Sequence, residues 1–299
     1  MPDVDTARRT TEPAAGPASA AARTARIPRR DRNRGPRLLI RCLALGYVFA
    51  LVALPVLSVV QHTFANGPGP VLDSLNDPDL LAAARLGIVV AVISVAVNTV
   101  FGVGMAVLLV RYRFPGRRLL GALIDLPLSI SPVVVGVALI LVYGQQGWIG
   151  EHLENLGIRI IFSTPGIVLA TIIVSLPLVV REVVPVLQEA GTEQDQAARS
   201  LGARTWQRFR RITLPTIKWA LAYGVVLSLA RSLGEFGAVR VVSGSVAGES
   251  QTPTLFVNDS YQEFGPAAEQ SAFTAAFALM LVAVLFIVLI AWLRPKEHS

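Results

Sequence analysis

Two oppositely charged side chains stand four residues apart within one apolar run of the sequence. Arg231 and Glu235 lie near the middle of residues 219–242, and positions i and i+4 of a helix share one face, so the two groups can pair. Ionised groups within a membrane are costly unless they face a partner or a water-filled cavity. The spacing therefore predicts either an ion pair that locks helix packing or charges that line a polar path, with Gly234 and Gly237 as flexible neighbours.

Hydroxyl groups occur in a second apolar run, between two prolines. Ser129 and Ser131 lie between Pro127 and Pro132, within residues 119–143. Proline lacks the backbone N–H and interrupts helical hydrogen bonding. The simpler interpretation is a kinked helix that its neighbours stabilise. The alternative is a local opening that exposes N–H and O–H donors.

Residues 188–218 form a polar, basic segment between two further apolar runs. Helical propensity extends over 193–201, is interrupted at Gly202 and resumes over 204–212, which predicts two short helices at a sharp angle. In the second helix, Trp206, Phe209 and Ile212 recur at a helical spacing and give it an apolar face. The arginines of this helix point away from that face: Arg208, Arg210 and Arg211. A solvated basic loop lying on anionic headgroups would explain the same composition.

The bulk composition indicates a membrane protein. The chain has 299 residues, of which 53% are hydrophobic and only 16% charged, and its mean hydropathy is +0.56. A soluble domain of this length would need more charge to cover its surface. The net charge of +7 comes from basic residues that lie between apolar runs, not on one soluble face, so we expect no nucleic-acid partner.

Metal and redox chemistry are not expected. The single cysteine, Cys42, lies in an apolar stretch and cannot form an intrachain disulfide. His62, His152 and His298 are far apart in the sequence and show no ligand spacing. We therefore predict no metal site.

Six apolar runs are each close to the roughly 20 residues that a helix needs to cross a bilayer. Only helices satisfy their own backbone groups one span at a time, so we predict an all-α, polytopic membrane protein. The predicted spans are 38–60, 84–110, 119–143, 166–187, 219–242 and 270–292. They define a transmembrane domain over 38–293, between a disordered basic cytoplasmic tail over 1–37 and a short cytoplasmic tail over 294–299.

The segments between the spans differ in charge. One set is basic and contains Arg111, Arg113, Arg117, Arg118, the arginines of 188–218, Arg294 and Lys296. The other set is mainly acidic and contains Asp73, Asp77, Asp79, Glu151, Glu154, Glu249, Asp259, Glu263 and Glu269, with Arg159 as its main basic exception. By the positive-inside rule, both termini are predicted to be cytoplasmic. Arg240, near the outer end of the fifth span, is expected to reach the interface or a vestibule.

The polar segment carries a sequence motif. Gln196-Ala197-Ala198 is followed by Gly202, and Ile212 and Leu214-Pro215 complete the pattern. This spacing resembles the EAA signature of ATP-binding-cassette importer permeases and departs from it only at Gln196, where that family has glutamate. In that family the segment forms coupling helices that dock in a cleft of the ATPase subunit, so the resemblance implies a coupling loop over residues 188–216. Its coupling residues would be Gln196, Ala197, Ala198, Gly202, Ile212, Leu214 and Pro215, with Glu193 and Asp195 as candidates for the missing charge.

Two further stretches narrow the family. Residues 228–244 (SLARSLGEFGAVRVVSG), and residues 126–136 together with 143–147, resemble sulfate, thiosulfate and molybdate permeases, above all those of the CysW type. The resemblance covers residues 38–292 and implies the MetI-like fold of type I importer permeases, with six transmembrane helices. It also implies import of sulfate or thiosulfate across the cytoplasmic membrane of a bacterium by alternating access.

The expected partners follow from the same resemblance. The sequence holds no Gly-x-x-x-x-Gly-Lys-Ser/Thr segment, and its only lysines are Lys218 and Lys296, so it offers no phosphate-binding loop. We therefore expect a non-catalytic subunit without a cofactor, with ATP and Mg bound by a separate dimer of cytoplasmic ATPase subunits. A second, related permease subunit and an extracytoplasmic sulfate-binding protein would complete the importer.

In such an importer the anion path would use the polar residues of the third and fifth spans: Arg231, Gly234, Glu235, Gly237, Ser129 and Ser131. Arg231 would supply positive potential, while Glu235 and the two glycines would belong to the gate. Two other functions remain open. One is a molybdate or tungstate permease that works as a homodimer, and the other is an ion-coupled secondary carrier, against which the coupling motif argues.

Overall fold

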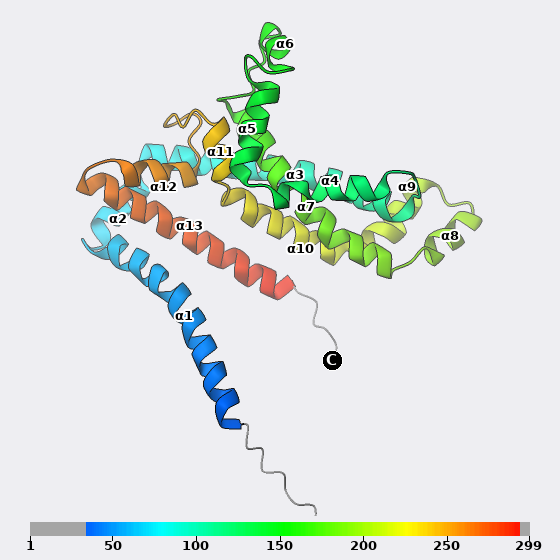
Figure 1. Ribbon diagram of the computed structural model, residues 1–299, viewed down its shortest axis with the longest axis horizontal. Coiled ribbons are helices and arrows are strands. Elements are labelled where there is room, and N and C mark those ends of the chain that lie inside the picture. The colour runs from blue at the N-terminus through cyan, green and yellow to red at the C-terminus, as the bar shows by residue number, and fades with distance from the viewer. Residues whose placement is uncertain (1–33, 294–299) are drawn as a thin grey trace, which may run out of the picture. The chain divides into compact units, whose positions relative to one another are not determined.

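A computed structural model describes residues 34–293, with side chains from Ile40 onward (Figure 1). The regular elements of this range are all helices: α1 (Arg34–Phe64), α2 (Pro68–Leu75), α3 (Pro78–Arg111), α4 (Arg117–Ser129), α5 (Pro132–Tyr143), α6 (Gly150–Asn155), α7 (Thr164–Glu189), α8 (Glu193–Ser200), α9 (Thr205–Arg208), the π-helix η1 (Phe209–Thr213), α10 (Leu214–Leu233), α11 (Gly237–Val242), α12 (Pro253–Gln262) and α13 (Pro266–Leu293). The all-α fold predicted from the sequence is confirmed.

The two predicted tails fall mostly on residues 1–33 and 294–299, which lie outside the described range. Helix α1 begins at Arg34, a few residues before the predicted start of the first span. The chain divides into two units at residue 52. The described side chains of the first unit, Ile40 to Val52, belong to the apolar stretch Ile40–Phe64.

Five helical stretches are long and apolar enough to cross a membrane: Ile40–Phe64, Pro78–Arg111, Thr164–Glu189, Thr205–Leu233 and Pro266–Leu293. A sixth span is obtained if α4 and α5 are taken as one, although their axes are bent by 112°. The predicted number of six is therefore met only with this broken pair. The break falls at Ile130 and Ser131, between the two prolines where the sequence predicted a kink or a local opening.

The break between α4 and α5 has a local cause. The residue before a proline is driven away from helical torsion angles, and Ser131, which precedes Pro132, has φ −58° and ψ 134°. Ile130 is also extended, with ψ 145°. Pro132 then starts α5 in the first turn, where a missing N–H costs nothing.

The predicted fifth span, 219–242, is also interrupted. Helix α10 begins earlier, at Leu214, and ends at Leu233, and α11 begins at Gly237. Residues 234–236 between them are not helical. The Glu235 side chain accepts a hydrogen bond from the N–H of Ala238 at 2.9 Å, which satisfies a free donor in the first turn of α11.

Helices α3, α7 and α10 pack together in the second unit, as Figure 1 shows. Two glycines allow this. A Cβ on Gly102 of α3 would lie 2.9 Å from the Cβ of Val179 on α7, and one on Gly224 of α10 would lie 3.2 Å from the Cα of Val179. Close contact at small residues is the usual packing of membrane helices.

A polar contact accompanies this packing. The buried Asn98 of α3 donates from Nδ2 to the Oγ of Ser175 on α7 at 2.8 Å. Ser232 of α10 donates to the same oxygen at 3.5 Å. Hydrogen bonds of this kind hold helices together where lipid offers no alternative partner.

Candidate functional site

The two interrupted spans meet at their breaks. A Cβ on Gly237, the first residue of α11, would lie 3.1 Å from the Cβ of Pro132, the first residue of α5. One turn along α5, a Cβ on Gly136 would lie 2.7 Å from the Cβ of Val241 and 2.9 Å from the main-chain oxygen of Ala238. Glycine at these positions is what lets the two helices approach. The structure thus brings together the two stretches that the sequence singles out.

Glu235 occupies the break in the fifth span and is buried, with 2% of its side chain exposed. Its Oε2 lies 2.8 Å from Nη1 of Arg231, so the predicted pairing of these residues is confirmed. Its Oε1 accepts from the N–H of Ala238 at 2.9 Å, and its main-chain oxygen accepts from the hydroxyl of Thr254 on α12 at 2.8 Å. One residue therefore ties α10, α11 and α12 together.

The two members of this ion pair differ in accessibility. The side chain of Arg231 is 36% exposed, whereas that of Glu235 is almost fully enclosed. Their contact has ion-pair distance without hydrogen-bond geometry, and Oε2 has no hydrogen-bond partner within residues 40–293. A buried carboxylate needs compensation to stay charged. The guanidinium supplies that compensation and remains the member that a solute can reach.

Ser129 and Ser131 lie at the break in the third span, and both are exposed. Ser131 accepts hydrogen bonds with its main-chain oxygen from the N–H groups of Val134 and Val135, at 2.9 and 3.3 Å. In the described part of the chain, neither hydroxyl forms a hydrogen bond to protein. Both hydroxyls are therefore available as donors.

Gly234 follows the last residue of α10 and Gly237 starts α11, but only one of these two positions requires a glycine. Gly234 has φ −90° and ψ 7°, a conformation open to any residue. Gly237 is required by its close approach to Pro132. The sequence assigned both a role in flexibility, and the structure gives only Gly237 a specific steric reason.

Asp259 on α12 forms a network of polar contacts that the sequence analysis did not predict. Its carboxylate accepts hydrogen bonds from Ser245, Gln251 and Asn258, at 2.5, 2.9 and 3.1 Å, and lies 3.1 Å from Nη1 of Arg240. Burial alone would raise the pKa of Asp259, but these hydrogen bonds and the Arg240 charge lower it below the ordinary 3.8. The carboxylate therefore stays ionised at neutral pH.

The contact with Asp259 changes the role expected for Arg240. The sequence suggested a side chain that reaches the interface or a vestibule, whereas the structure pairs it with an acid nineteen positions along the chain. The sequence offers little indication of the contact between Arg240 and Asp259, because ion pairs across a loop have no fixed spacing along the chain. The Thr252-Pro253 start of α12 was the available sign that the loop holds a helix.

The coupling loop forms the predicted pair of helices, α8 and α9, around Gly202. Gly202 has φ +81°, which favours glycine, and follows Leu201, the C-cap residue of α8. Its N–H donates to the oxygen of Arg199 at 3.0 Å, and the N–H of Ala203 donates to the oxygen of Ala198 at 3.0 Å. These two bonds form a Schellman motif, so the glycine of the signature ends the first helix and sets the turn.

The side chains of the coupling loop are largely exposed. No residue of α8 is buried, and Leu201 and Trp206 are 88% and 68% exposed. Gln196 is exposed and donates to the hydroxyl of Thr192 at 3.1 Å. Of the remaining signature positions, Ala197 is exposed, Ala198 and Ile212 are partly buried, and Leu214 and Pro215 begin α10.

One expectation for the coupling loop is corrected. The second helix is not regular over 204–212, because α9 is a single turn that continues as the π-helix η1. Arg208, which was expected to point away from the apolar face, pairs with Asp195, one of the two candidates for the missing charge. Nη1 of Arg208 lies 2.6 Å from Oδ2 of Asp195. The rings of Trp206 and Phe209 stack with centroids 5.5 Å apart.

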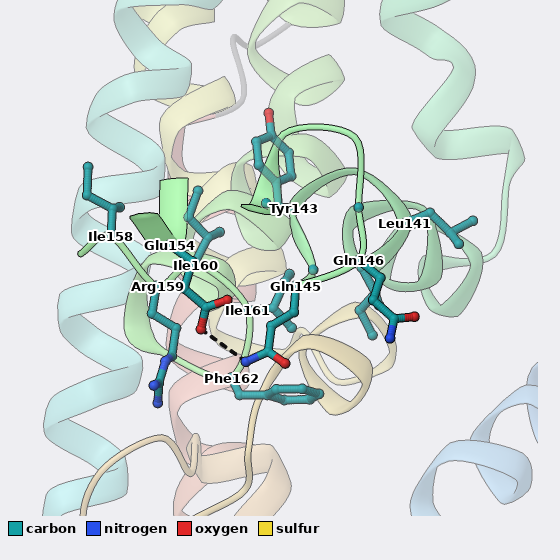
Figure 2. Close-up of a pocket in the computed structure, with 14 residues that line it drawn as sticks. Leu141, Tyr143, Gln145, Gln146, Glu154, Ile158, Arg159, Ile160, Ile161 and Phe162 are labelled. Carbon is teal, nitrogen blue, oxygen red and sulfur yellow. Dashed lines mark hydrogen bonds between the residues drawn. The ribbon is translucent and has the colours of Figure 1, made fainter. Parts of the chain in front are cut away.

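A pocket of about 560 Å³ lies in the connection between α5 and α7, around residues 140–162. Figure 2 shows Gln145 and Glu154 joined within it, and Nε2 of Gln145 donates to Oε1 of Glu154 at 3.0 Å. Arg159 also lines the pocket. One guanidinium and one carboxylate give the lining no net charge, so the pocket is a poor site for a dianion.

Comparison with known proteins gives a consistent result. Residues 98–298 match the family described as "Binding-protein-dependent transport system inner membrane component". The chain is 48% identical over 253 residues to "Sulfate transport system permease protein CysW" of Synechocystis sp., covering 85% of this chain and 91% of the relative. It is 45% identical over 274 residues to the protein of the same name from Escherichia coli K12, covering 92% and 93%.

A second kind of relative is more distant. The chain is 38% identical over 244 residues to "Sulfate transport system permease protein CysT" of Escherichia coli K12, covering 81% of this chain and 88% of the relative. Among solved structures, the chain resembles a bacterial alginate ABC transporter in complex with an alginate pentasaccharide-bound periplasmic protein. The TM-score is 0.69 at 16% identity, covering 87% of this chain and 94% of that chain. At this identity the likeness concerns the fold.

Proposed function

The chain belongs to the family of binding-protein-dependent transport system inner membrane components, and within it to the CysW-type permeases, so we propose that it forms half of the pore of an ATP-driven sulfate importer. The relatives carry sulfate in their names, and identities near one half over most of both chains support the same substrate here. The chain itself would perform no covalent chemistry. Its task is to open a polar path for a hydrated dianion without leaving a continuous pore.

The observation that carries the proposal is the geometry of the coupling loop. Leu201, directly after α8, and Trp206, on α9, are exposed on either side of the turn at Gly202. Exposed apolar side chains at a polar, basic turn are poorly suited to water and well suited to a cleft on another protein. We assign that cleft to a cytoplasmic dimer of ATPase subunits, which would bind ATP and Mg. Gln196, Ala197, Ala198 and Ile212 are the other contact candidates on the same turn.

Two further partners complete the proposed assembly. The similarity to CysT-named permeases supports a second half that is related but not identical. An extracytoplasmic binding protein would deliver sulfate, in keeping with the description of the family. The basic residues of the coupling loop, of the segment after α3 and of the segment after α13 support an orientation with both termini in the cytoplasm of a bacterial cell.

The meeting point of the two broken helices is the proposed path. Arg231 would provide positive potential there, and the free hydroxyls of Ser129 and Ser131 would replace part of the anion's hydration. Glu235, Gly234 and Gly237 would form the hinge between α10 and α11. ATP-driven closure of the ATPase dimer would move the coupling loop, tilt α10 and open this hinge to one side at a time.

Uptake of labelled anions tests the proposal. In bacterial cells that lack this chain, sulfate uptake should be lost and should return when the chain is supplied again. Molybdate uptake should be unaffected by the deletion. Loss of molybdate uptake with normal sulfate uptake would contradict the assigned substrate.

A further inference from the structure

The two helices of the coupling loop are joined by one ion pair. Nη1 of Arg208, the last residue of α9, lies 2.6 Å from Oδ2 of Asp195, in the first turn of α8. Their side chains are only 18% and 24% exposed, although the loop around them is largely open. Within the described residues, this is the only side-chain hydrogen bond or ion pair between α8 and α9.

The turn at Gly202 does not hold the two helices by itself. Both bonds of its Schellman motif run back to α8, from Gly202 to Arg199 and from Ala203 to Ala198. They end α8 but leave the direction of α9 to the backbone torsions of the residues that follow. The ion pair between Asp195 and Arg208 adds a direct link between a side chain of α8 and a side chain of α9.

The same pair lies on the route from the loop to the membrane. Arg208 is followed directly by the π-helix η1, which leads into α10. Asp195 and Arg208 line a recess of about 410 Å³ together with Arg111 of α3. Arg111 in turn donates to the main-chain oxygen of Gly191, just before α8. The loop is therefore braced against α3 on one side and continuous with α10 on the other.

We propose that the Asp195–Arg208 pair is a strut that fixes the angle between the coupling helices, so that displacement of α8 is passed to α10 and not absorbed at Gly202. This inference rests on the proposed function, because it assumes that an ATPase subunit moves α8. Asp195 and Arg208 are positioning residues, since they act through the helices that they join. The pair also removes Asp195 from the groups that can replace the glutamate missing at Gln196, and leaves the exposed Glu193 for that contact.

The proposal is tested by the amount of sulfate imported per ATP hydrolysed, which a pair that only stabilises the fold would not change. The importer would be reconstituted in lipid vesicles with its ATPase subunits, its second half and its binding protein, and sulfate imported per ATP hydrolysed would be measured for each assembled complex. In Asp195→Asn and in Arg208→Met, ATP hydrolysis should continue while this ratio falls about fivefold, which corresponds to losing a pair worth roughly 1 kcal/mol.

Matched variants separate the pair from the general charge of the loop. Glu189→Gln and Arg210→Met remove exposed charges of the same loop and should keep the normal ratio. The exchange of Asp195→Arg with Arg208→Asp rebuilds the pair in reverse and should recover most of the ratio. A normal ratio in both single variants would overturn the strut, and so would a loss of assembled complex at an unchanged ratio.

In the same experiment, uptake by the importer with the unmodified chain tests the proposed function itself. Absence of ATP-dependent uptake by the intact importer would overturn the proposed function and, with it, the strut. Normal uptake by the intact importer together with normal ratios in the variants would overturn the strut alone.

Discussion

Glu235 contacts three helices through its two carboxylate oxygens and its main-chain oxygen. A carboxylate buried this deeply stays charged only where positive charge and N–H groups replace the lost water. Arg231 provides the charge, and Ala238 provides the N–H. Since Arg231 is the accessible member of the pair, a passing dianion would meet a guanidinium whose orientation Glu235 fixes.

Replacement of both charged residues separates a path from a packing role. Arg231→Met alone leaves Glu235 uncompensated and should destabilise the protein by roughly 3 kcal/mol, the lower end for such pairs because Arg231 is partly exposed. The double variant Arg231→Met with Glu235→Gln keeps the acceptor for the Ala238 N–H and should assemble normally. If Arg231 serves the anion, the double variant should still fail to import sulfate.

The measurement is sulfate uptake normalised to assembled complex in membranes. Arg231→Lys is the matched control, because it keeps the charge without the guanidinium fork and should retain partial transport. Near-normal uptake by the double variant would leave the two residues as a packing device and refute the path.

Gly202 provides a second test at the residue scale. Its φ of +81° costs a residue other than glycine about 1 kcal/mol or more, and β-branched residues most. Apart from Gly202 and its two neighbours in the chain, no atom of the described residues lies within 4 Å of a Cβ built there, so the strain is in the backbone alone. Gly202→Val should lose ATP-driven uptake while inserting normally, and Gly202→Asn, which tolerates this conformation, should keep most of it. Equal uptake by the two variants would contradict the role of the turn.

At the scale of elements, the two interrupted spans pack against each other where α5 and α11 meet. Helix α5 begins at Pro132 and α11 begins at Gly237, and these residues are in contact. An interrupted helix leaves unpaired backbone groups, which are tolerated in a membrane protein where they are buried in protein or line a cavity. The pairing of two such breaks favours a hinge over two independent kinks.

Gly136 tests this packing directly. A Cβ there would lie 2.7 Å from the Cβ of Val241 and 2.9 Å from the main-chain oxygen of Ala238, which cannot move aside without shifting α11. Gly136→Ala should therefore lower the thermal stability of the purified protein, by about 1–3 kcal/mol for such overpacking. Gly104→Ala in α3 is the control, because nothing lies within 4 Å of its Cβ and alanine favours the helix. Equal melting temperatures for the two variants would show that α5 and α11 are not tightly packed.

The sequence predicted the helical class, the coupling turn and the Arg231–Glu235 pair, because hydropathy, signature spacing and helical i, i+4 geometry are local properties. The prolines of the third span indicated a kink or a local opening there, but the break in the fifth span was not predicted, since mean hydropathy is insensitive to the direction of a helix axis. Pro132 carried the local signal for the first break. Contacts between distant segments could not be predicted from the sequence, because they have no fixed spacing. An example is the ion pair between Asp125 of α4 and Arg181 of α7, which are 56 positions apart.

At the scale of the whole chain, the distribution of charge predicts the orientation in the membrane. Asp73 lies in an acidic connection and Arg204 in the basic coupling loop, and both side chains are exposed. In a Cys42→Ser background, Asp73→Cys should react with an impermeant thiol reagent added outside intact cells, whereas Arg204→Cys should react only after permeabilisation. The opposite pattern would invert the proposed topology.

The central claim is that ATP hydrolysed by partner subunits on the side of the coupling loop drives sulfate through this chain. Sulfate accumulation in vesicles that contain the purified importer tests it most directly. We predict accumulation only with the binding protein outside and hydrolysable ATP inside, and none with a non-hydrolysable analogue or with a proton or sodium gradient alone. Accumulation driven by an ion gradient in the absence of ATP would contradict the account.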